Sequence, residues 1–234
     1  MPTMNSSRRA SGFAALYLAA ALVAAMLYFL VGTNMPSVTD PMKQVDLLVD
    51  HQFGLHLMYL IAYVAFGLVL AVLALGLHER LARSAPAAAR VATAIGVIWA
   101  GMLVASGVVF IVGMNSVVDL HTTDPAAAVD AWQAIYPVTL GLGGAGGEVL
   151  GGTWVLLVSL IALRGHALPT WLNWLGLIVG ATGIISAVPG LADVAVVFGL
   201  LVVVWFVGLG VTLLREHPAN VADGPAERLV SAAR

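Results

Sequence analysis

The sequence predicts an all-α fold, a polytopic membrane protein folded as a bundle of six transmembrane helices. Its 234 residues are 61% hydrophobic and 9% charged, with a mean hydropathy of +0.99, whereas about a quarter of the residues in soluble proteins are charged. Its apolar runs are long enough to cross roughly 30 Å of hydrocarbon. They lack strand-like alternation, and only helices or closed barrels satisfy the backbone in lipid, so we expect helices.

Six such runs follow one another and are the expected spans: about 12–32, 53–77, 91–114, 134–163, 171–188 and 194–214. The first follows Arg8 and Arg9, as the core of a signal peptide would, but it is longer than the usual core of about 7 to 15 residues. We therefore expect a retained helix. A single membrane domain over 12–216 would then lie between an N-terminal segment (1–11) and a polar tail (217–234) that we expect to be disordered.

The basic residues set the expected orientation. Lys43 alone lies on one side of a six-span layout, and nine arginines lie on the other: Arg8, Arg9, Arg80, Arg83, Arg90, Arg164, Arg215, Arg228 and Arg234. Because positively charged loops stay in the cytoplasm, both termini are expected to be cytoplasmic. The arginine-rich and alanine-rich usage is typical of a GC-rich bacterial genome, so the expected location is the bacterial plasma membrane. The opposite face is acidic: Asp40, Asp46, Asp50, Asp119, Asp124, Asp130 and Asp193.

Two expected outer loops contain the related phrases "TDPMKQVD" and "TDPAAAVD", each just before a helix that runs inward. Asp40 and Asp124 are predicted N-caps, with Pro41 and Pro125 at the first helical position. The match can mark a duplicated helix pair or two independent caps with the same chemistry. We favour independent caps, because the flanking residues do not extend the match.

Residues 141–152 read "GLGGAGGEVLGG". Gly143, Gly147 and Gly151 recur every four residues, a spacing that lets another helix approach closely in the membrane. The stretch also contains glycines in the GxGxxG order of dinucleotide-binding proteins. That motif requires a strand that turns into a helix, so we expect a helix-packing seam and no nucleotide site.

Glu148, inside this stretch, is the only charged residue within the expected spans. The span over 134–163 places it near the bilayer midplane, where an ionised carboxylate that faces lipid costs roughly 2.5 kcal/mol or more. One hypothesis makes Glu148 a proton or cation site in a cavity. The other makes it a neutral acid that is hydrogen-bonded within the bundle, with Ser106, Thr182 and Ser186 as candidate partners.

A polar stripe in the second expected span supports the first hypothesis. Gln52, His56, Tyr59 and Tyr63 fall at i, i+4, i+7 and i+11, on one face of a helix. The face is expected to look into the bundle, because a helix that faces lipid has no reason to gather polar groups. The stripe is either the wall of an outward-opening pocket that ends near Glu148 or a set of hydrogen bonds between helices.

A metal site is a sharper alternative, since imidazole and carboxylate groups suit zinc or copper. Histidines and aspartates gather at the outer ends of the second and third spans: His51, His56, His121, Asp50 and Asp119. His51 and His56, however, are about 140° apart around a helix, unlike the i, i+4 pairs of metal-binding helices.

Other chemistries lack their residues. The chain has no cysteine, which excludes disulfides and catalytic thiols. Its one lysine, Lys43, lies in a loop, so a retinal Schiff base is excluded, and no Ser-His or Asp-Asp pair lies within the spans. We therefore favour a protein that is not an enzyme. We expect no cofactor and no nucleic-acid partner; the lipid bilayer is the expected partner, and the oligomeric state stays open.

The second half of the chain resembles a known family. The segments "GGTWVLLVSLIALRGHALPTWLNWLGLIVGATGIISAVP" and "VFGLLVVVWFVGLGVTLLRE" are similar to a bacterial family of six-span membrane proteins described only as a domain of unknown function. The resemblance is strongest over 138–216. It implies a fold and a location but no activity. Where family members often carry Phe-Arg-Leu at the start of the second span, this chain has Phe53, Gly54 and Leu55.

Three classes of function follow from these observations. The first is a membrane protein that binds or moves a small solute or a proton through an outward-facing polar pocket ending at Glu148. The second is a non-catalytic structural or partner-binding protein, in which Glu148 is a buried hydrogen-bonding residue. The third is an extracytoplasmic metal site or a membrane enzyme.

Overall fold

The computed structural model describes residues 4–143, 148–191 and 193–215, and these residues form helices and turns with no strand. The elements are α1 (Met4–Leu27), the π-helical turn η1 (Tyr28–Gly32), the 3-10 turn η2 (Met35–Ser37), α2 (Pro41–Asp50), α3 (Gln52–Tyr59), the π-helical turn η3 (Leu60–Ala65), α4 (Phe66–Leu81), α5 (Pro86–His121), α6 (Pro125–Gly143), α7 (Glu148–Arg164), α8 (Thr170–Ile185) and α9 (Val194–Arg215).

Five apolar segments are long enough to cross a membrane: Arg8–Gly32, Gln52–Leu81, Pro86–His121, Pro125–Arg164 and Val194–Arg215. The fourth of them runs across residues 144–147, which lie outside the described residues. The helix in the predicted span 171–188 has only 16 residues, about 24 Å at 1.5 Å per residue. The predicted span 134–163 corresponds to two helices, α6 and α7. The fold is therefore all-helical, with apolar helices that suit a bilayer, and the segments long enough to cross it number five rather than six.

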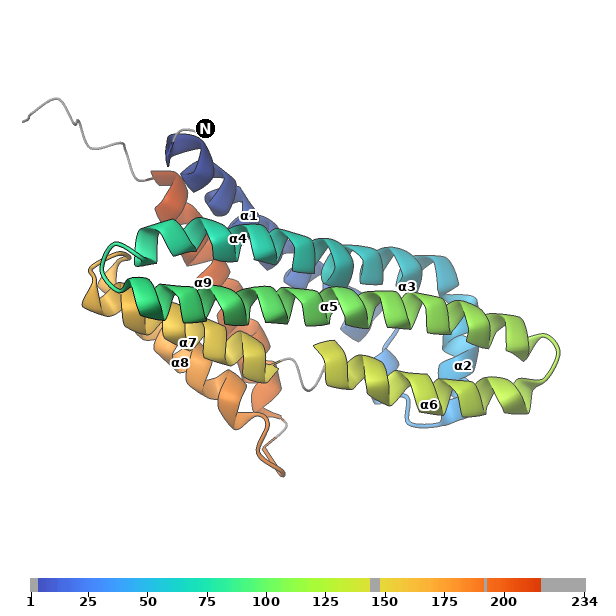
Figure 1. Ribbon diagram of the computed structural model, residues 1–234. Coiled ribbons are helices and arrows are strands. Elements are labelled where there is room, and N and C mark those ends of the chain that lie inside the picture. The colour runs from blue at the N-terminus through green and yellow to red at the C-terminus, as the bar shows by residue number, and fades with distance from the viewer. Residues whose placement is uncertain (1–3, 144–147, 192, 216–234) are drawn as a thin grey trace, which may run out of the picture.

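The 36-residue helix α5 runs along most of the molecule, over about 54 Å. In Figure 1, α3 and α4 follow it on one side as one nearly continuous run, while α6 and α7 lie against its two halves. Helices α1 and α9 pair with each other and cross α4 and α5 obliquely, and α8 lies beside α7. The short helix α2 packs against α5 and α6 near their connecting turn.

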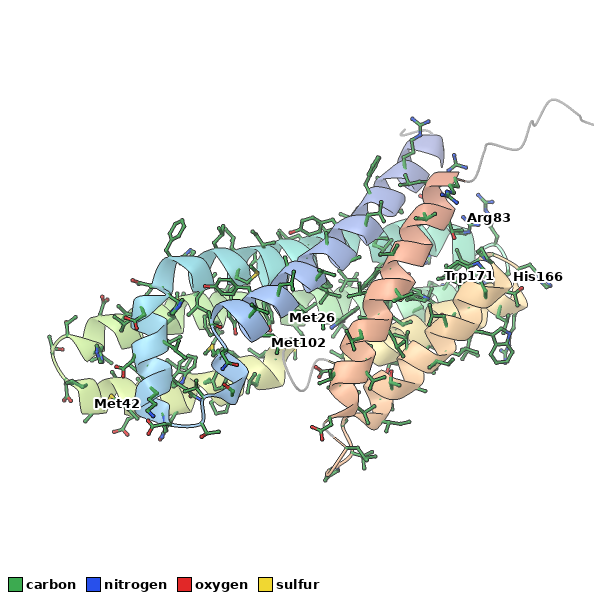
Figure 2. The ribbon with its side chains drawn as sticks, turned by 180° about the vertical axis from the view of Figure 1, so that it is seen from behind. Met26, Met42, Arg83, Met102, His166 and Trp171 are labelled. Atoms are coloured by element: carbon green, nitrogen blue, oxygen red, sulfur yellow. The ribbon has the colours of Figure 1, made fainter. Side chains whose placement is uncertain are left out.

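The two ends of the molecule carry opposite charges. Figure 2 shows Arg83, His166 and Trp171 at one end and Met42 toward the other. We call the first the arginine end. The α4–α5 and α7–α8 turns lie side by side there, and the Arg80 guanidinium donates a hydrogen bond to the Ala167 carbonyl. We call the other the acidic end. Its aspartates lie on α2, on α6 and around the α5–α6 turn: Asp46, Asp50, Asp119, Asp124 and Asp130.

The buried side chains form two apolar cores. The arginine-end core lies among α1, α4, α7, α8, α9 and the first half of α5, with Trp99, Trp154 and Trp205 near its centre. The acidic-end core lies among α2, α3, α6 and the second half of α5, around Phe110 and Trp132. Tyr63 packs against both cores. We call the level where the cores meet the waist; it contains Tyr63, Ser106, Gly143 and Glu148.

Both predicted N-caps are confirmed. The Asp40 carboxylate accepts hydrogen bonds from the backbone N–H groups of Met42 (2.9 Å) and Lys43 (3.2 Å) at the start of α2. The Asp124 carboxylate accepts one from Ala127 (3.1 Å) at the start of α6. These side chains satisfy amides that have no partner within the helix, and they fix where the two helices begin.

The predicted glycine seam packs on α5. A Cβ atom on Gly143 would lie 2.7 Å from Ser106 Cβ, and one on Gly151 would lie 2.7 Å from the Trp99 ring. Gly147 lies outside the described residues. The closest backbone contact involves a glycine that the stripe did not include, because a Cβ on Gly152 would lie 2.8 Å from the Gly180 carbonyl oxygen on α8. The glycine-rich stretch therefore packs on α5 through Gly143 and Gly151 and on α8 through Gly152.

Candidate functional site

Glu148 is the first residue of α7 and faces the last turn of α8. A Cβ atom on Gly183 would lie 2.7 Å from the Glu148 carbonyl oxygen. The 16-residue separation from Arg164 amounts to about 24 Å along α7. Counted from Arg164, this passes the midpoint of a hydrocarbon layer roughly 30 Å thick.

The carboxyl group of Glu148 is unsatisfied on one side. The residue as a whole is partly exposed, yet its Oε2 atom is buried and has no hydrogen-bond partner among the described residues. A buried polar atom without a partner costs on the order of 1–3 kcal/mol, more when it is charged. Such an atom calls for a proton, a cation or a water molecule.

The three hydroxyl groups proposed as partners are used elsewhere. Ser106 donates to the Thr139 carbonyl, Thr182 to the Val179 carbonyl and Ser186 to the Gly183 carbonyl, each at 2.8 Å. The Ser106 bond joins α5 to a carbonyl near the C-terminus of α6, whereas the Thr182 and Ser186 bonds are made within α8, near its C-terminal end. In the described part of the chain, none of these three hydroxyl groups therefore donates to Glu148.

One tyrosine lies within electrostatic range of Glu148 at the waist. This residue, Tyr63 on η3, lies within the same range of Tyr136 on α6. Its ring stacks on that of Tyr59, with centroids 4.6 Å apart, and the two hydroxyl groups share a hydrogen bond. The inner end of the predicted stripe thus approaches Glu148, and Tyr136 joins it from α6.

The outer part of the stripe is packed. Tyr59 is 5% exposed and stacks on Phe110 at 3.4 Å between centroids, so it belongs to the acidic-end core. Gln52 donates from Nε2 to Asn115 Oδ1 across to α5 at 3.2 Å, and His56 is partly buried between Gln52 and Tyr59. Gln52 therefore makes a hydrogen bond between helices, as one interpretation of the stripe expects. Of the four stripe residues, Tyr63 alone approaches Glu148, as the other interpretation, the wall of a pocket, expects.

The structure does not gather the five metal candidates. Within residues 4–143, 148–191 and 193–215, no group of three or more His, Asp or Glu side chains is arranged to hold a metal ion. His121 instead lies 3.9 Å from the Asp46 carboxylate, an ion pair between α5 and α2 when the imidazole is protonated. Asp50 and His51 end α2 and His56 belongs to α3, while Asp119 shares the last turns of α5 with His121.

Sequence reasoning missed the π-helical turn η3 and the residues around it. The Tyr17 hydroxyl on α1 donates to the Ile61 carbonyl at 3.0 Å, in the middle of that turn. A π turn shifts the helical register, and this one carries Tyr63. Pro137, inside α6, was a visible signal in this region, because a proline within a helix frees the carbonyl group four residues earlier, here that of Gln133.

No curated protein and no solved structure matches the chain. A family model described as a domain of unknown function, DUF4386, matches residues 13–215. The match covers both apolar cores, the waist and nearly every helix, and thus extends the resemblance of 138–216 into the first half. The chain belongs to the DUF4386 family.

Proposed function

We propose that this protein is a bacterial plasma-membrane protein that binds a proton or a small cation at Glu148. The proton or cation reaches this site from the extracytoplasmic side. The observation that carries the proposal is the buried Oε2 atom of Glu148, which has no hydrogen-bond partner among the described residues. Ionisable groups at membrane depth are costly, and they commonly mark proton or ion sites.

The surroundings of Glu148 favour a positively charged ligand. The residue stands beside the last turn of α8, and α6 ends at Gly143 on the same level. The C-terminal end of α8 carries partial negative charge, which acts on a cation together with the carboxylate. The N-terminal end of α7, where Glu148 itself lies, carries partial positive charge and stabilises the ionised carboxylate. The hydroxyl group of Tyr63, within electrostatic range of Glu148, adds an oxygen atom that can accept a hydrogen bond or donate one.

The route to the site comes from the acidic end. On the arginine side of Glu148, Trp99, Trp154 and Trp205 are at most 5% exposed and follow one another with ring centroids 5.9 and 5.8 Å apart. This layer is mainly apolar, and the buried polar atoms near it include Trp205 Nε1 and Ser159 Oγ. We infer access from the acidic end, which requires the packed side chains of Gln52, His56 and Tyr59 to move apart, and transport would also require α7 to separate from α5 or α8.

The proposed orientation rests on charge. Arginines at the arginine end favour the cytoplasmic side for that end and for both termini. Trp171 and Trp174 are 56% and 58% exposed in the first turns of α8, where aromatic side chains anchor helices at the membrane interface. We infer that α8, although short, makes a sixth crossing.

Infrared difference spectroscopy of the purified protein between about pH 4 and pH 8 tests the site. We expect the wild type to show one carboxyl band that changes with pH and is missing in Glu148→Gln. Glu79→Gln, which removes an exposed carboxyl group at the arginine end, is the matched control and should keep the band. Loss of intensity on addition of Na⁺ at constant pH would identify a cation as a competing ligand.

A permanently neutral Glu148, locked inside the protein, gives no band that responds to pH. If the wild-type and Glu148→Gln spectra coincide over the whole range, the proposal fails and the structural role is correct. Proteoliposomes that contain a pH-sensitive dye separate binding from transport. An unchanged internal pH with a titrating Glu148 indicates a binding site without proton flux.

A further inference from the structure

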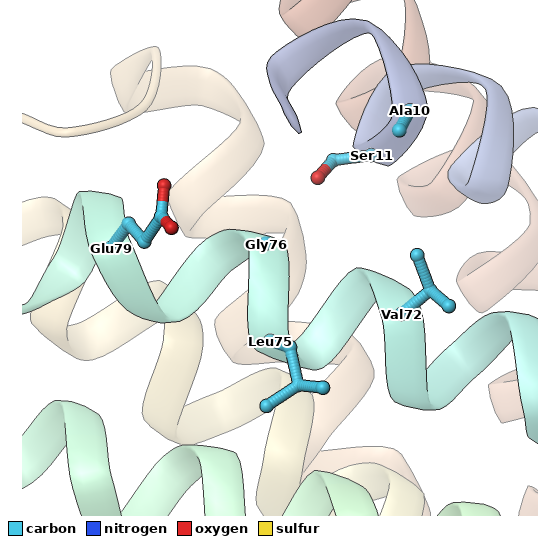
Figure 3. Close-up of a pocket in the computed structure, with 6 residues that line it drawn as sticks. All are labelled: Ala10, Ser11, Val72, Leu75, Gly76 and Glu79. Atoms are coloured by element: carbon cyan, nitrogen blue, oxygen red, sulfur yellow. The ribbon is translucent and has the colours of Figure 1, made fainter. Parts of the chain in front are cut away.

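A surface groove of about 240 Å³ lies between α1 and α4 at the arginine end, far from the waist. Figure 3 shows Glu79 at one end of the groove and Val72 at the other, with Ala10 and Ser11 of α1 above Gly76 of α4. Neither the DUF4386 assignment nor the proposed Glu148 site accounts for this groove.

Small side chains create the groove. A Cβ atom on Gly76 would lie 2.0 Å from Ser11 Oγ, so the glycine lets α1 cross α4 at close range there. Beside this crossing, Ala10 is exposed and short. The space that a longer side chain would fill at Ala10 stays open to the surroundings of the protein.

The groove changes from apolar to charged along its length. Val72 and Leu75 are 52% and 58% exposed, and Glu79 follows them on α4, also exposed. From Val72 to Glu79 the helix rises about 10 Å. The charged end lies toward the arginine end, so the order matches a bilayer leaflet, with hydrocarbon first and headgroups after it.

Positive charge stands at the same level as Glu79. Helix α1 starts at the arginine end and α4 ends there, so the two helices are antiparallel. Because Ser11 faces Gly76, the residues that precede Ser11, Arg8 and Arg9, come level with the residues that follow Gly76. Of the described residues that line the groove, Glu79 is the charged one, and Arg8 and Arg9 lie on the neighbouring turn of α1.

We propose that this groove binds a zwitterionic aminophospholipid of the arginine-side leaflet, with phosphatidylethanolamine as the type. Its primary ammonium would donate to Glu79, and one acyl chain would lie along Val72 and Leu75. A primary ammonium has three N–H donors for a carboxylate, whereas the quaternary ammonium of choline has none. An anionic lipid without an amine is repelled by the negative charge of Glu79.

The test measures lipids retained by the purified full-length chain. The protein is equilibrated in detergent with equal amounts of phosphatidylethanolamine, phosphatidylcholine and phosphatidylglycerol, and native mass spectrometry counts the bound molecules. We expect phosphatidylethanolamine to be retained about three- to fivefold more than either other lipid, the size expected of one exposed charged contact. Glu79→Gln should remove this preference. Ala10→Leu, which fills the groove, should lower the retention of all three lipids.

Two controls are matched to these variants. Asp193→Asn removes an exposed carboxylate outside the groove, and Ala87→Leu adds the same side chain to another exposed alanine at the arginine end. Both should retain lipids as the wild type does. If Ala10→Leu fails to fold, Glu79→Gln still decides the outcome, because it changes one exposed polar group.

Two results would overturn the proposal. Equal retention of the three lipids by the wild type would mean that the groove does not recognise the headgroup. A preference for phosphatidylglycerol that Glu79→Gln leaves unchanged would mean that the arginines bind anionic lipid without the groove. Neither result bears on Glu148, whose protonation is read out separately by infrared spectroscopy.

Discussion

His166 shows how space and backbone geometry compete at a single residue. It follows the end of α7 with φ = 50°, in the left-handed region, and Ala167 N–H bonds to the Ala162 carbonyl at 2.9 Å, as in a Schellman motif. Glycine is preferred at this position. The chain instead has glycine one residue earlier, at Gly165, where a Cβ would lie 2.2 Å from Ser84 Oγ.

Replacing His166 by glycine should therefore stabilise the protein. The left-handed conformation costs a residue with a side chain roughly 1–2 kcal/mol, and the extra freedom of glycine in the unfolded chain takes back about 0.4–1 kcal/mol. We expect His166→Gly to raise the free energy of unfolding by about 0.5–1 kcal/mol, measured by thermal unfolding in detergent. Gly165→Ala should lower it. A lower melting temperature for His166→Gly would show that the imidazole makes a stabilising contact that outweighs the strain.

Glu148 marks how far single residues could be predicted. The sequence identified it because it is the one charged residue in the expected spans. Its surroundings could not be predicted in the same way. They depend on the π turn that positions Tyr63 and on carbonyls near helix ends that engage Ser106 and Ser186, and neither leaves a periodic signal in the sequence.

At the scale of the helix, some glycines are packed against a neighbouring helix and others are exposed. Gly152 on α7 contacts the backbone of α8, since a Cβ atom placed on it would lie 2.8–3.0 Å from atoms of Gly180 and Gly183. Gly101 on α5 is exposed, and a Cβ there meets nothing within 4 Å. The same residue type therefore has opposite consequences in two helices of one protein.

The two glycines make a matched pair for substitution by alanine. Gly101→Ala should stabilise the protein by roughly 0.5–1 kcal/mol, because alanine is the better helix former. Gly152→Ala should destabilise it by about 1–3 kcal/mol, because a methyl group forced into close packing displaces the neighbouring helix. Thermal unfolding of both variants in the same detergent measures the difference. Equal shifts would mean that α7 and α8 are not in backbone contact.

Helix ends were harder to predict than helices. Both Asp-Pro caps were predicted, because a cap is a local interaction of a few residues. The separation of α6 from α7 was not, since the apolar run continues across both helices without a break in composition. The length of α8 was not predicted either. It ends at Ile185, where Ser186 N–H bonds to the Thr182 carbonyl, and the apolar pattern continues to Val188.

On the scale of the whole molecule, charge and apolar length give different counts of membrane crossings. Five segments are long enough to cross, whereas the arginine distribution fits an even number. The outcome depends on α8. If α8 crosses, the turn around Asp193 lies on the side of the α5–α6 turn; if it does not, that turn lies with the arginines.

The absence of cysteine from the chain makes this question directly testable, because every introduced thiol is the only one. Ala87→Cys, Thr123→Cys and Asp193→Cys each replace an exposed residue, at the arginine end, at the α5–α6 turn and before α9. A maleimide that cannot cross membranes is applied to intact bacterial cells and then to lysed cells. We expect positions 123 and 193 to react in intact cells and position 87 only after lysis, because the arginines hold their end in the cytoplasm.

If position 193 reacts only after lysis, as position 87 does, α8 returns to the cytoplasmic face without crossing. Glu148, which contacts its last turn, would then lie closer to the cytoplasm than to the outer surface, and the proposed extracytoplasmic access would be wrong.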